Sequence, residues 1–344
     1  MEPLRLRAAN IGAFLALLLL APPAIGAPVD DLVAAAKKEG VIEFYAPSTL
    51  TPQGAQALGE AFNKRHGLSV KLNYHSSGGM TRDVGRLASL AAAGQPPDWD
   101  VMVVHDAGHS TLWLRKLHKP FDYRKLGIDP RVINFDNGTV VIANQFALQA
   151  YNSKVLPAQD VPKRWEDLLD PKWKGGKLGM GTATHHLARL ATVWGEEKTT
   201  EYVKALAGQK PSLGRLAEIY TRLLLGEILV AITQLDEFIH RAKVTGAPIV
   251  FAEGVQPVIA PGVNAGVLKG ARHANAGHLF TAFLTTPEAQ EIWEKYQGQT
   301  SAFVPGTKSY KYAQGKKVLF MTQDQAEMVD RLTAEYGKIF GFTK

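Results

Sequence analysis

Residues 41–74 of the chain are VIEFYAPSTLTPQGAQALGEAFNKRHGLSVKLNY. The stretch begins with β-branched and aromatic residues at 41–45, which predict a buried strand. Thr51-Pro52 has the order of an N-cap and a first helical residue, and Gly67 is a natural end for the helix that they open. Residues 68–74 then predict a second strand. Strand, helix and strand in this order indicate one βαβ unit.

The same alternation continues on both sides of this unit. A helix is predicted over 29–38, before the first strand, and another over 79–93, after the second. Residues 100–104 (DVMVV) predict a third buried strand. Alternating strands and helices favour a parallel sheet covered by helices on both faces.

The second half of the chain repeats this organisation. An apolar stretch over 139–151 is long enough to run from one lobe to another, and 262–268 is able to cross back. Further elements are predicted as a short helix at 165–169, a strand at 176–180, a helix at 184–194, a strand at 228–232, and helices at 274–284, 287–296 and 322–339. The chain is too long for one hydrophobic core, so we expect two α/β lobes, each with a mostly parallel sheet, and a ligand cleft between them. The predicted first lobe is 27–140 plus 257–303, and the second is 141–256 plus 304–344.

The N-terminus has the pattern of a secretory signal. Arg5 and Arg7 precede an apolar run over 11–20, and small residues follow, with a predicted cleavage near Gly26. Ten apolar residues are too few to span about 30 Å of hydrocarbon. We therefore expect a protein exported to the periplasm, without membrane insertion of the mature chain.

Composition narrows the class of protein further. The formal net charge is +7, which favours anionic partners, but the Lys and Arg residues are scattered and give no nucleic-acid-binding run. The chain has no cysteine, so disulfides and thiolate metal sites are excluded. No Walker loop, Gly-x-Ser-x-Gly elbow, His-Glu-x-x-His or dinucleotide fingerprint occurs. We expect neither an enzyme nor a cofactor.

The ligand-binding residues are expected where strands of a parallel sheet end. In the first lobe these loops are 46–51 and 76–79, and the second combines hydroxyls, glycines and a helix start, which together suit an anion. Ser76 or Ser77 is equally well placed to cap the following helix. The predicted contacts in this lobe are Tyr45, Ser48, Thr49, Ser77, Gly78 and His105.

In the second lobe, the loop 179–186 is again rich in glycine and threonine and leads into a helix. His185 and His186 are adjacent and point in different directions on a helix, so at most one of them is expected to contact a ligand. The predicted contacts here are Thr182, Thr184, His185, Gln234 and Asp236, with Asp236 the weakest of them.

His105 and His109 have a spacing that allows metal binding. Residues four apart lie on one helical face, where two imidazoles are able to share an ion. No third motif of a zinc protease accompanies them. A position on the rim of the cleft or on the surface is the preferred interpretation, and the metal ligands stay unknown.

Several segments resemble one protein family. They are PDWDV at 97–101, YNSK at 151–154, PKRWEDLLDPKWKG at 162–175, GEI at 226–228 and AGVLK at 265–269. Over nearly the whole mature chain, the sequence resembles the ferric-iron-binding-protein-like branch of bacterial extracellular solute-binding proteins. The resemblance implies the type II periplasmic binding protein fold and a role in handing a small-molecule ligand to the permease and ATPase of an ABC importer. The protein is expected to be a monomer.

The resemblance also implies how iron is bound in that branch, and here the sequence departs from it. Ferric members bind iron through two adjacent tyrosines, and at that position this chain has Leu235-Asp236. The histidine ligand of the ferric members falls near Thr49 of this chain, and their carboxylate ligand falls near His105. Leucine and threonine cannot replace the anionic oxygens that Fe³⁺ prefers. Tyr45, Tyr220, Asp236 or Glu237 remain able to form a different site.

The preferred ligand is therefore a small organic or phosphorylated anion. Ferric iron, free or as a chelate, is the first alternative. A receptor that presents its ligand to a periplasmic sensor is the second, and an enzyme on the same fold is the least favoured.

Overall fold

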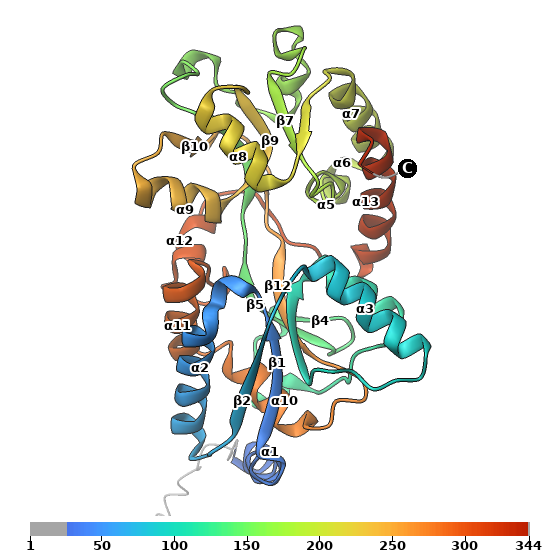
Figure 1. The fold of residues 1–344 in the computed structure, drawn as a ribbon, viewed down its shortest axis with the longest axis vertical. Coiled ribbons are helices and arrows are strands. Elements are labelled where there is room, and N and C mark those ends of the chain that lie inside the picture. The colour runs from blue at the N-terminus through green and yellow to red at the C-terminus, as the bar shows by residue number, and fades with distance from the viewer. Residues whose placement is uncertain (1–25, 343–344) are drawn as a thin grey trace, which may run out of the picture.

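The computed structural model describes residues 26–342, which form two α/β lobes, each built around one sheet (Figure 1). The predicted signal segment, 1–26, lies outside the described residues except for Gly26, where helix α1 begins. Within the described range, none of the helices is both long and apolar enough to cross a membrane.

The sheet of lobe 1 has six strands. Its spatial order is β2 (Lys71–Ser76), β1 (Val41–Ala46), β3 (Val101–His105), β12 (Gly262–Val267), β5 (Thr139–Asn144) and β4 (Ile133–Asn134). β1 pairs in parallel with both β2 and β3, as the strand and helix alternation predicts. The carboxyl ends of these three strands therefore meet at one edge of the sheet, facing lobe 2.

The sheet of lobe 2 has seven strands. Its order is β13 (Val318–Leu319), β11 (Val258–Ile259), β6 (Ala147–Asn152), β9 (Val230–Leu235), β7 (Leu178–Gly181) and β8 (Ser212–Gly214), with β10 (Ile249–Phe251) also paired to β6. β7 is parallel to both β8 and β9. This lobe thus repeats the three parallel strands of lobe 1.

Both sheets are mixed, with antiparallel strands added to the parallel strands that were expected. β12 is antiparallel to β3 and β5, and β6 is antiparallel to β9. β6 and β12 each enter a sheet directly from the other lobe, without a helical crossover. The crossover that makes the strands of a βαβ unit parallel therefore does not apply to them.

The chain passes between the lobes through two short connections. β5 ends at Asn144 in the first sheet and β6 begins at Ala147 in the second, so the apolar stretch 139–151 is two strands joined by Gln145-Phe146. The return runs from β11 to β12 through Ala260-Pro261. A pair of short connections of this kind allows one lobe to turn against the other.

Helices cover both sheets (Figure 1). Lobe 1 carries α1 (Gly26–Glu39), α2 (Thr51–His66), α3 (Met80–Ala92), α4 (Asp106–Leu114), α10 (Ala274–Phe283) and α11 (Pro287–Gln297). Lobe 2 carries α5 (His185–Ala188), α6 (Ala191–Trp194), α7 (Glu196–Gly208), α8 (Leu216–Leu225), α9 (Asp236–Thr245), α12 (Lys308–Ala313) and α13 (Ala326–Phe340). Short 3-10 turns occupy 48–50, 123–126, 130–132, 158–160, 165–169, 171–173 and 323–325. The C-terminal helix α13 packs on α5 and α7 of its own lobe and also on α4 of lobe 1.

Some predicted elements shift by a few residues for a local reason. Gly67 ends α2 in the left-handed conformation, as predicted, with a φ of 62°. The following strand begins at Lys71 instead of residue 68, because the side chain of Asn63 bonds both the N–H and the C=O of Val70 at 2.9 Å. The predicted strand 228–232 is β9 at 230–235, which moves Gln234 from a loop into the sheet.

The core of lobe 1 buries a histidine in neutral form. His278 on α10 is 3% exposed, stacks on Phe121 and lies 2.9 Å from the hydroxyl of Tyr123. Burial, with a smaller contribution from Lys119, lowers the pKa of His278 to about 3. Between this value and the ordinary pKa of about 6.5, the unfolded chain binds a proton that the native state rejects.

Acidification should therefore destabilise the protein through His278. Relative to a His278→Gln variant, wild type should lose up to about 1.4 kcal/mol of unfolding free energy per pH unit below pH 6.5. Urea unfolding at pH 7, 6 and 5 measures this difference. Parallel pH profiles for the two proteins would show that His278 is not held neutral.

Candidate ligand-binding cleft

A cavity of about 400 Å³ lies between the two lobes, and we call it the central cleft. Lobe 1 and the connections contribute Pro47, Ser48, Thr49, Ser77, Gly78, Gly79, Met80, His105, Gln145, Val263, Gln297 and Gln299. Lobe 2 contributes Leu216, Leu235 and Glu237. The loops after β1, β2 and β3 supply most of the lining, because the carboxyl ends of these parallel strands meet at this edge.

The loop after β2 presents a helix start to the cleft. The amide N–H of Gly79 donates to Oγ of Ser77 at 3.2 Å, and α3 begins at the next residue. The first N–H groups of an α-helix have no acceptor within the helix and carry partial positive charge. Arg82, in the first turn, lies so close to Gly78 that a Cβ at this position would overlap its guanidinium. This wall of the cleft is electropositive.

A hydrogen-bonded chain behind the cleft fixes Ser77. The hydroxyl of Tyr45 lies 2.6 Å from Oγ of Ser77 and 2.7 Å from the carboxylate of Asp83. The pKa of Asp83 is lowered despite partial burial, because Tyr45 and Arg82 donate to its carboxylate. An ionised carboxylate only accepts, so the single phenolic proton goes to Asp83 and the phenol accepts from Ser77. Ser77 thereby presents an oxygen lone pair to the cleft.

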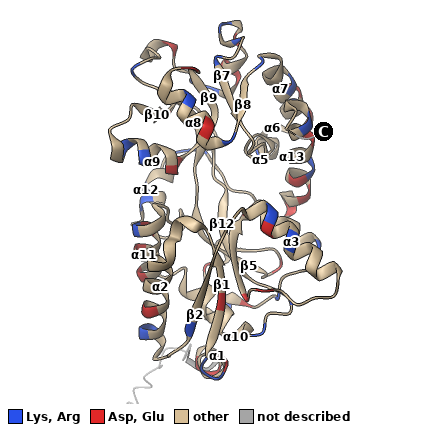
Figure 2. Ribbon diagram, viewed as in Figure 1, with Lys and Arg blue, Asp and Glu red and all other residues tan. Residues whose placement is uncertain are grey.

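Lobe 2 faces this wall with carboxyl groups at the start of α9. Burial raises the pKa of Glu237, which lines the cleft. Burial also raises the pKa of Asp236 to about 7, although its Oδ1 accepts a bond from the N–H of Phe146 at 3.1 Å. The described residues that line the cleft include neither Lys nor Arg, and Figure 2 shows the basic residues spread over outer elements such as α2 and α3.

Three glutamines complete the lining, and sequence reasoning missed them. Gln145 lies in the first connection, and Gln297 and Gln299 flank the glycine that ends α11. Thr49 donates to Oε1 of Gln297 at 2.6 Å, which ties the loop after β1 to α11. These positions are not loops after parallel strands, so only the position of Gln145 inside the predicted crossing stretch 139–151 offered a signal.

The structure brings together five of the predicted contacts and places the other six elsewhere. Those in the cleft are Ser48, Thr49, Ser77, Gly78 and His105. Tyr45 is 1% exposed and lies behind Ser77. Thr182 is exposed and outside the lining, while the hydroxyl of Thr184 donates to the backbone oxygen of Thr333 at 2.9 Å. Gln234 is buried within β9 and bonds Leu216 O, Asp236 is bonded to the backbone of Phe146, and His185 lines a neighbouring cavity.

His105 and His109 do not form a metal site. Nε2 of His109 lies 3.0 Å from the backbone oxygen of Asn264, and its Nδ1 lies 2.9 Å from Nε2 of His118. Both ring nitrogens of His109 are therefore occupied, and burial lowers its pKa to about 4. Within residues 26–342 there is no group of three His, Asp or Glu side chains able to hold a metal ion.

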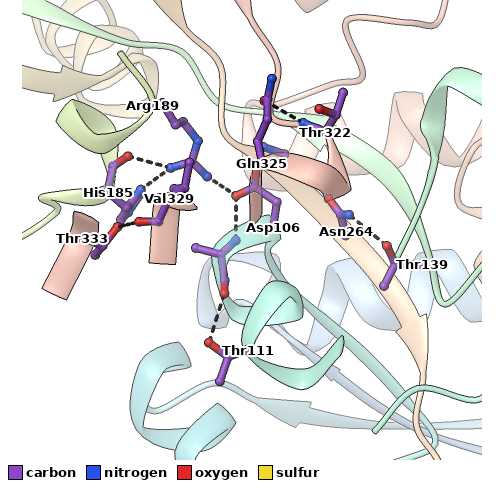
Figure 3. A network of polar contacts seen from close by, with 12 residues as sticks. Asp106, Thr111, Thr139, His185, Arg189, Asn264, Thr322, Gln325, Val329 and Thr333 are labelled. Atoms are coloured by element: carbon purple, nitrogen blue, oxygen red, sulfur yellow. Dashed lines mark hydrogen bonds and ion pairs between the residues drawn. The ribbon is translucent and has the colours of Figure 1, made fainter. Parts of the chain in front are cut away.

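A buried ion pair joins the lobes beside the cleft (Figure 3). The Asp106 carboxylate at the start of α4 pairs with the Arg189 guanidinium of lobe 2, and their side chains are 5% and 1% exposed. The second oxygen of Asp106 accepts from the N–H of Gly262 at 3.0 Å. Arg189 also donates to the backbone oxygen of His185 at 2.9 Å and approaches its Nδ1 at 2.7 Å. His185 is consequently engaged by Arg189, and burial with neighbouring positive charge lowers its pKa.

Breaking this ion pair should destabilise the fold strongly. Asp106→Asn leaves Arg189 buried without its counterion, and we expect a loss of about 3–5 kcal/mol in unfolding free energy by urea titration. Glu196→Gln is the matched control, because Glu196 pairs with Arg331 at 2.6 Å on the surface, where a loss below about 1 kcal/mol is expected. Equal losses in the two variants would contradict this assignment.

The comparisons with known proteins agree with this architecture. An iron-bound HitA structure from Pseudomonas aeruginosa is 19% identical, covers 86% of this chain and 99% of its own, and has a TM-score of 0.67. AfuA from Actinobacillus pleuropneumoniae, with fructose-6-phosphate bound, is 20% identical, with coverages of 88% and 99% and a TM-score of 0.64. FutA from Trichodesmium, with iron and citrate, is 19% identical, with coverages of 88% and 100% and a TM-score of 0.69. The fold is that of the type II periplasmic binding proteins.

The sequence comparison then gives the family. A family model described as bacterial extracellular solute-binding protein matches residues 42–296, and the chain belongs to this family. It is a family of binding proteins and not of enzymes, in agreement with the missing catalytic motifs. An uncharacterised protein of Haemophilus influenzae is 30% identical over 150 residues, which are 41% of this chain and 42% of that relative.

Proposed function

We propose that this protein captures a small organic anion, a carboxylate or a phosphate ester, in the central cleft and hands it to the permease of an ABC importer. The observation that carries the proposal is the electropositive wall of lobe 1. There, the hydroxyl of Ser48 and the first N–H groups of α3 face the cleft, and the guanidinium of Arg82 lies against Gly78 outside the lining. A helix N-terminus with adjacent hydroxyls is a general binding site for carboxylate and phosphate groups.

The opposite wall supports an organic ligand with a second polar group. Glu237 has its pKa raised by burial, so its carboxyl group holds a proton more readily and is able to donate to a ligand oxygen as well as to accept. Gln145 and Gln299 add amide donors and acceptors. Leu216 and Leu235 are apolar and cover the carbon skeleton of the ligand. The fructose-6-phosphate complex of AfuA is a precedent on this fold for a phosphorylated organic anion.

The cleft is poorly suited to ferric iron. Among the described residues, its lining contains no tyrosine and one carboxyl group, that of Glu237. Fe³⁺ requires several anionic oxygen ligands, and the neutral hydroxyls and amides that dominate here do not supply them. At the phenolate position proposed from the sequence, this chain has Leu235, the last residue of β9, and Asp236, which bonds the backbone of Phe146.

The proposal includes the location and the partners of the protein. After export and removal of residues 1–26, the mature chain works as a monomer in the periplasm. Closure of the lobes about the two connections would bury the ligand and present a joint surface to the permease, which its ATPase drives.

Binding should be visible as a rise in melting temperature. The protein, refolded without ligand, is screened against citrate, glycerol 3-phosphate, fructose 6-phosphate, ferric chloride and uncharged glycerol, because a ligand that binds only the native state stabilises it. We expect a rise with at least one organic anion and none with glycerol. A rise with ferric chloride alone would reject the proposal.

The electropositive wall is tested by removing its hydroxyls. Ser48→Ala combined with Ser77→Ala should weaken calorimetric binding of the best anion about tenfold, because Ser48 is lost as a donor at about 0.5–1.5 kcal/mol and Ser77 no longer holds the N–H of Gly79 at the start of α3. Thr182→Ala is the matched control, since Thr182 is an exposed hydroxyl residue outside the lining. Unchanged affinity in the double variant would place the anion elsewhere.

A further inference from the structure

A second cavity adjoins the central cleft, and we call it the apolar cavity. Its volume is about 250 Å³, and it lies between α3 and α4 of lobe 1 and α13 of lobe 2. Met80 and His105 line both cavities, so they mark the junction between them. The two cavities are neighbours between the lobes, and their linings differ in chemistry.

The walls of the apolar cavity are mainly hydrocarbon. Val84, Val104, Met321 and Val329 contribute apolar side chains that are each at least nine-tenths buried. The hydroxyl of Thr333 donates to the backbone oxygen of Val329 at 2.6 Å, so its methyl group is left for contacts across the cavity. Contact between such a surface and an apolar group of a ligand is favourable, because both are removed from water. The surface offers few hydrogen-bond partners to water molecules.

Thr111, on α4, has its hydroxyl between two acceptors. It lies 3.3 Å from the backbone oxygen of Ala107 one helical turn earlier and 3.5 Å from Oδ1 of Asp330 on α13, a carboxylate that also lines the cavity. In the described lining of this cavity, the buried polar atoms without a hydrogen-bond partner are Nδ1 of His105 and Oγ of Ser110.

The size of the apolar cavity suits a ring or a branched chain. An apolar cavity of about 150 Å³ is enough to bind benzene in a protein interior. The cavity has walls from both lobes, and the buried Asp106–Arg189 pair joins the lobes right beside it. The cavity is therefore present although the lobes are already in contact through this ion pair. The packing between the lobes does not require α4 and α13 to move closer together.

We infer that the ligand is amphipathic: its anionic group occupies the electropositive wall of the central cleft, and an aromatic or branched aliphatic substituent occupies the apolar cavity beyond His105 and Met80. The inference rests on the proposed function for the anionic group. It narrows the ligand class from any small organic anion to one with a hydrophobic substituent.

The first test compares three probes on the wild-type protein by calorimetry: propionate, 3-phenylpropionate and the uncharged 3-phenylpropanol. We expect 3-phenylpropionate to bind about tenfold or more tightly than propionate, because the phenyl group becomes buried. Equal affinities of the two acids would overturn the inference and leave the proposed function intact. Binding of the alcohol as tight as that of the phenyl acid would support the apolar cavity and reject the anion site. No binding of any probe would overturn both for this ligand class.

The second test fills the apolar cavity. Thr333→Met adds a longer apolar side chain without removing a bond to another element, and Thr111→Leu adds one from α4 but also removes the contact of the Thr111 hydroxyl with Oδ1 of Asp330 at 3.5 Å. Each should weaken 3-phenylpropionate about tenfold and leave propionate unchanged. Thr221→Met is the matched control, since this exposed threonine on α8 donates to Ala217 O one turn earlier and lines neither cavity. Equal loss for both acids, in variants whose melting temperature is retained, would overturn the inference.

Discussion

The buried ion pair between Asp106 and Arg189 is the constraint on which the relation of the two lobes depends. Each charge has lost its water, and only its partner and the surrounding hydrogen bonds offset that cost. Asp106 begins α4 directly after β3, and its second oxygen holds Gly262, the first residue of the returning strand β12. One carboxylate therefore ties a helix start, a connection between the lobes and the opposite lobe together. A rotation of one lobe against the other that leaves this ion pair intact must therefore have its axis close to the pair.

This arrangement also explains why the space between the lobes has two kinds of wall. On one side of His105, loops that follow parallel strands bring hydroxyls and free N–H groups to the edge of the sheet. On the other side, α4 and α13 face each other with Thr111, Val329 and Thr333. Both threonine hydroxyls bond backbone oxygens of their own helices, and Thr111 also contacts Asp330. Burial lowers the pKa of His105, so a neutral ring separates the two regions. A neutral imidazole is compatible with both a polar and an apolar neighbour.

Much of lobe 1 is predictable from sequence because its signals are local. Thr51-Pro52 and Gly67 fix the ends of α2, and Ser77 and Gly78 lie in the cleft because they follow a parallel strand. The contacts of lobe 2 depend on pairings between distant residues. A two-residue shift of β9 buries Gln234, and Thr184 bonds a backbone oxygen 149 residues away. Local patterns carry no information on such pairings. Arg189 likewise shows its role only once Asp106, 83 residues earlier, is beside it.

Ligand selectivity depends on side chains that line the cleft and whose identity the fold does not determine. HitA, FutA and AfuA share this architecture at about one-fifth identity, and their structures hold iron, iron with citrate, and fructose-6-phosphate. In this chain the last residue of β9, Leu235, and the second residue of α9, Glu237, line the cleft. Leu235 removes an oxygen ligand and adds apolar surface, and burial disfavours the charge on Glu237. Both changes reduce the negative charge available to a bare cation and leave the positive end of α3 as the main electrostatic feature, which is the physical basis for proposing an anionic ligand on this fold.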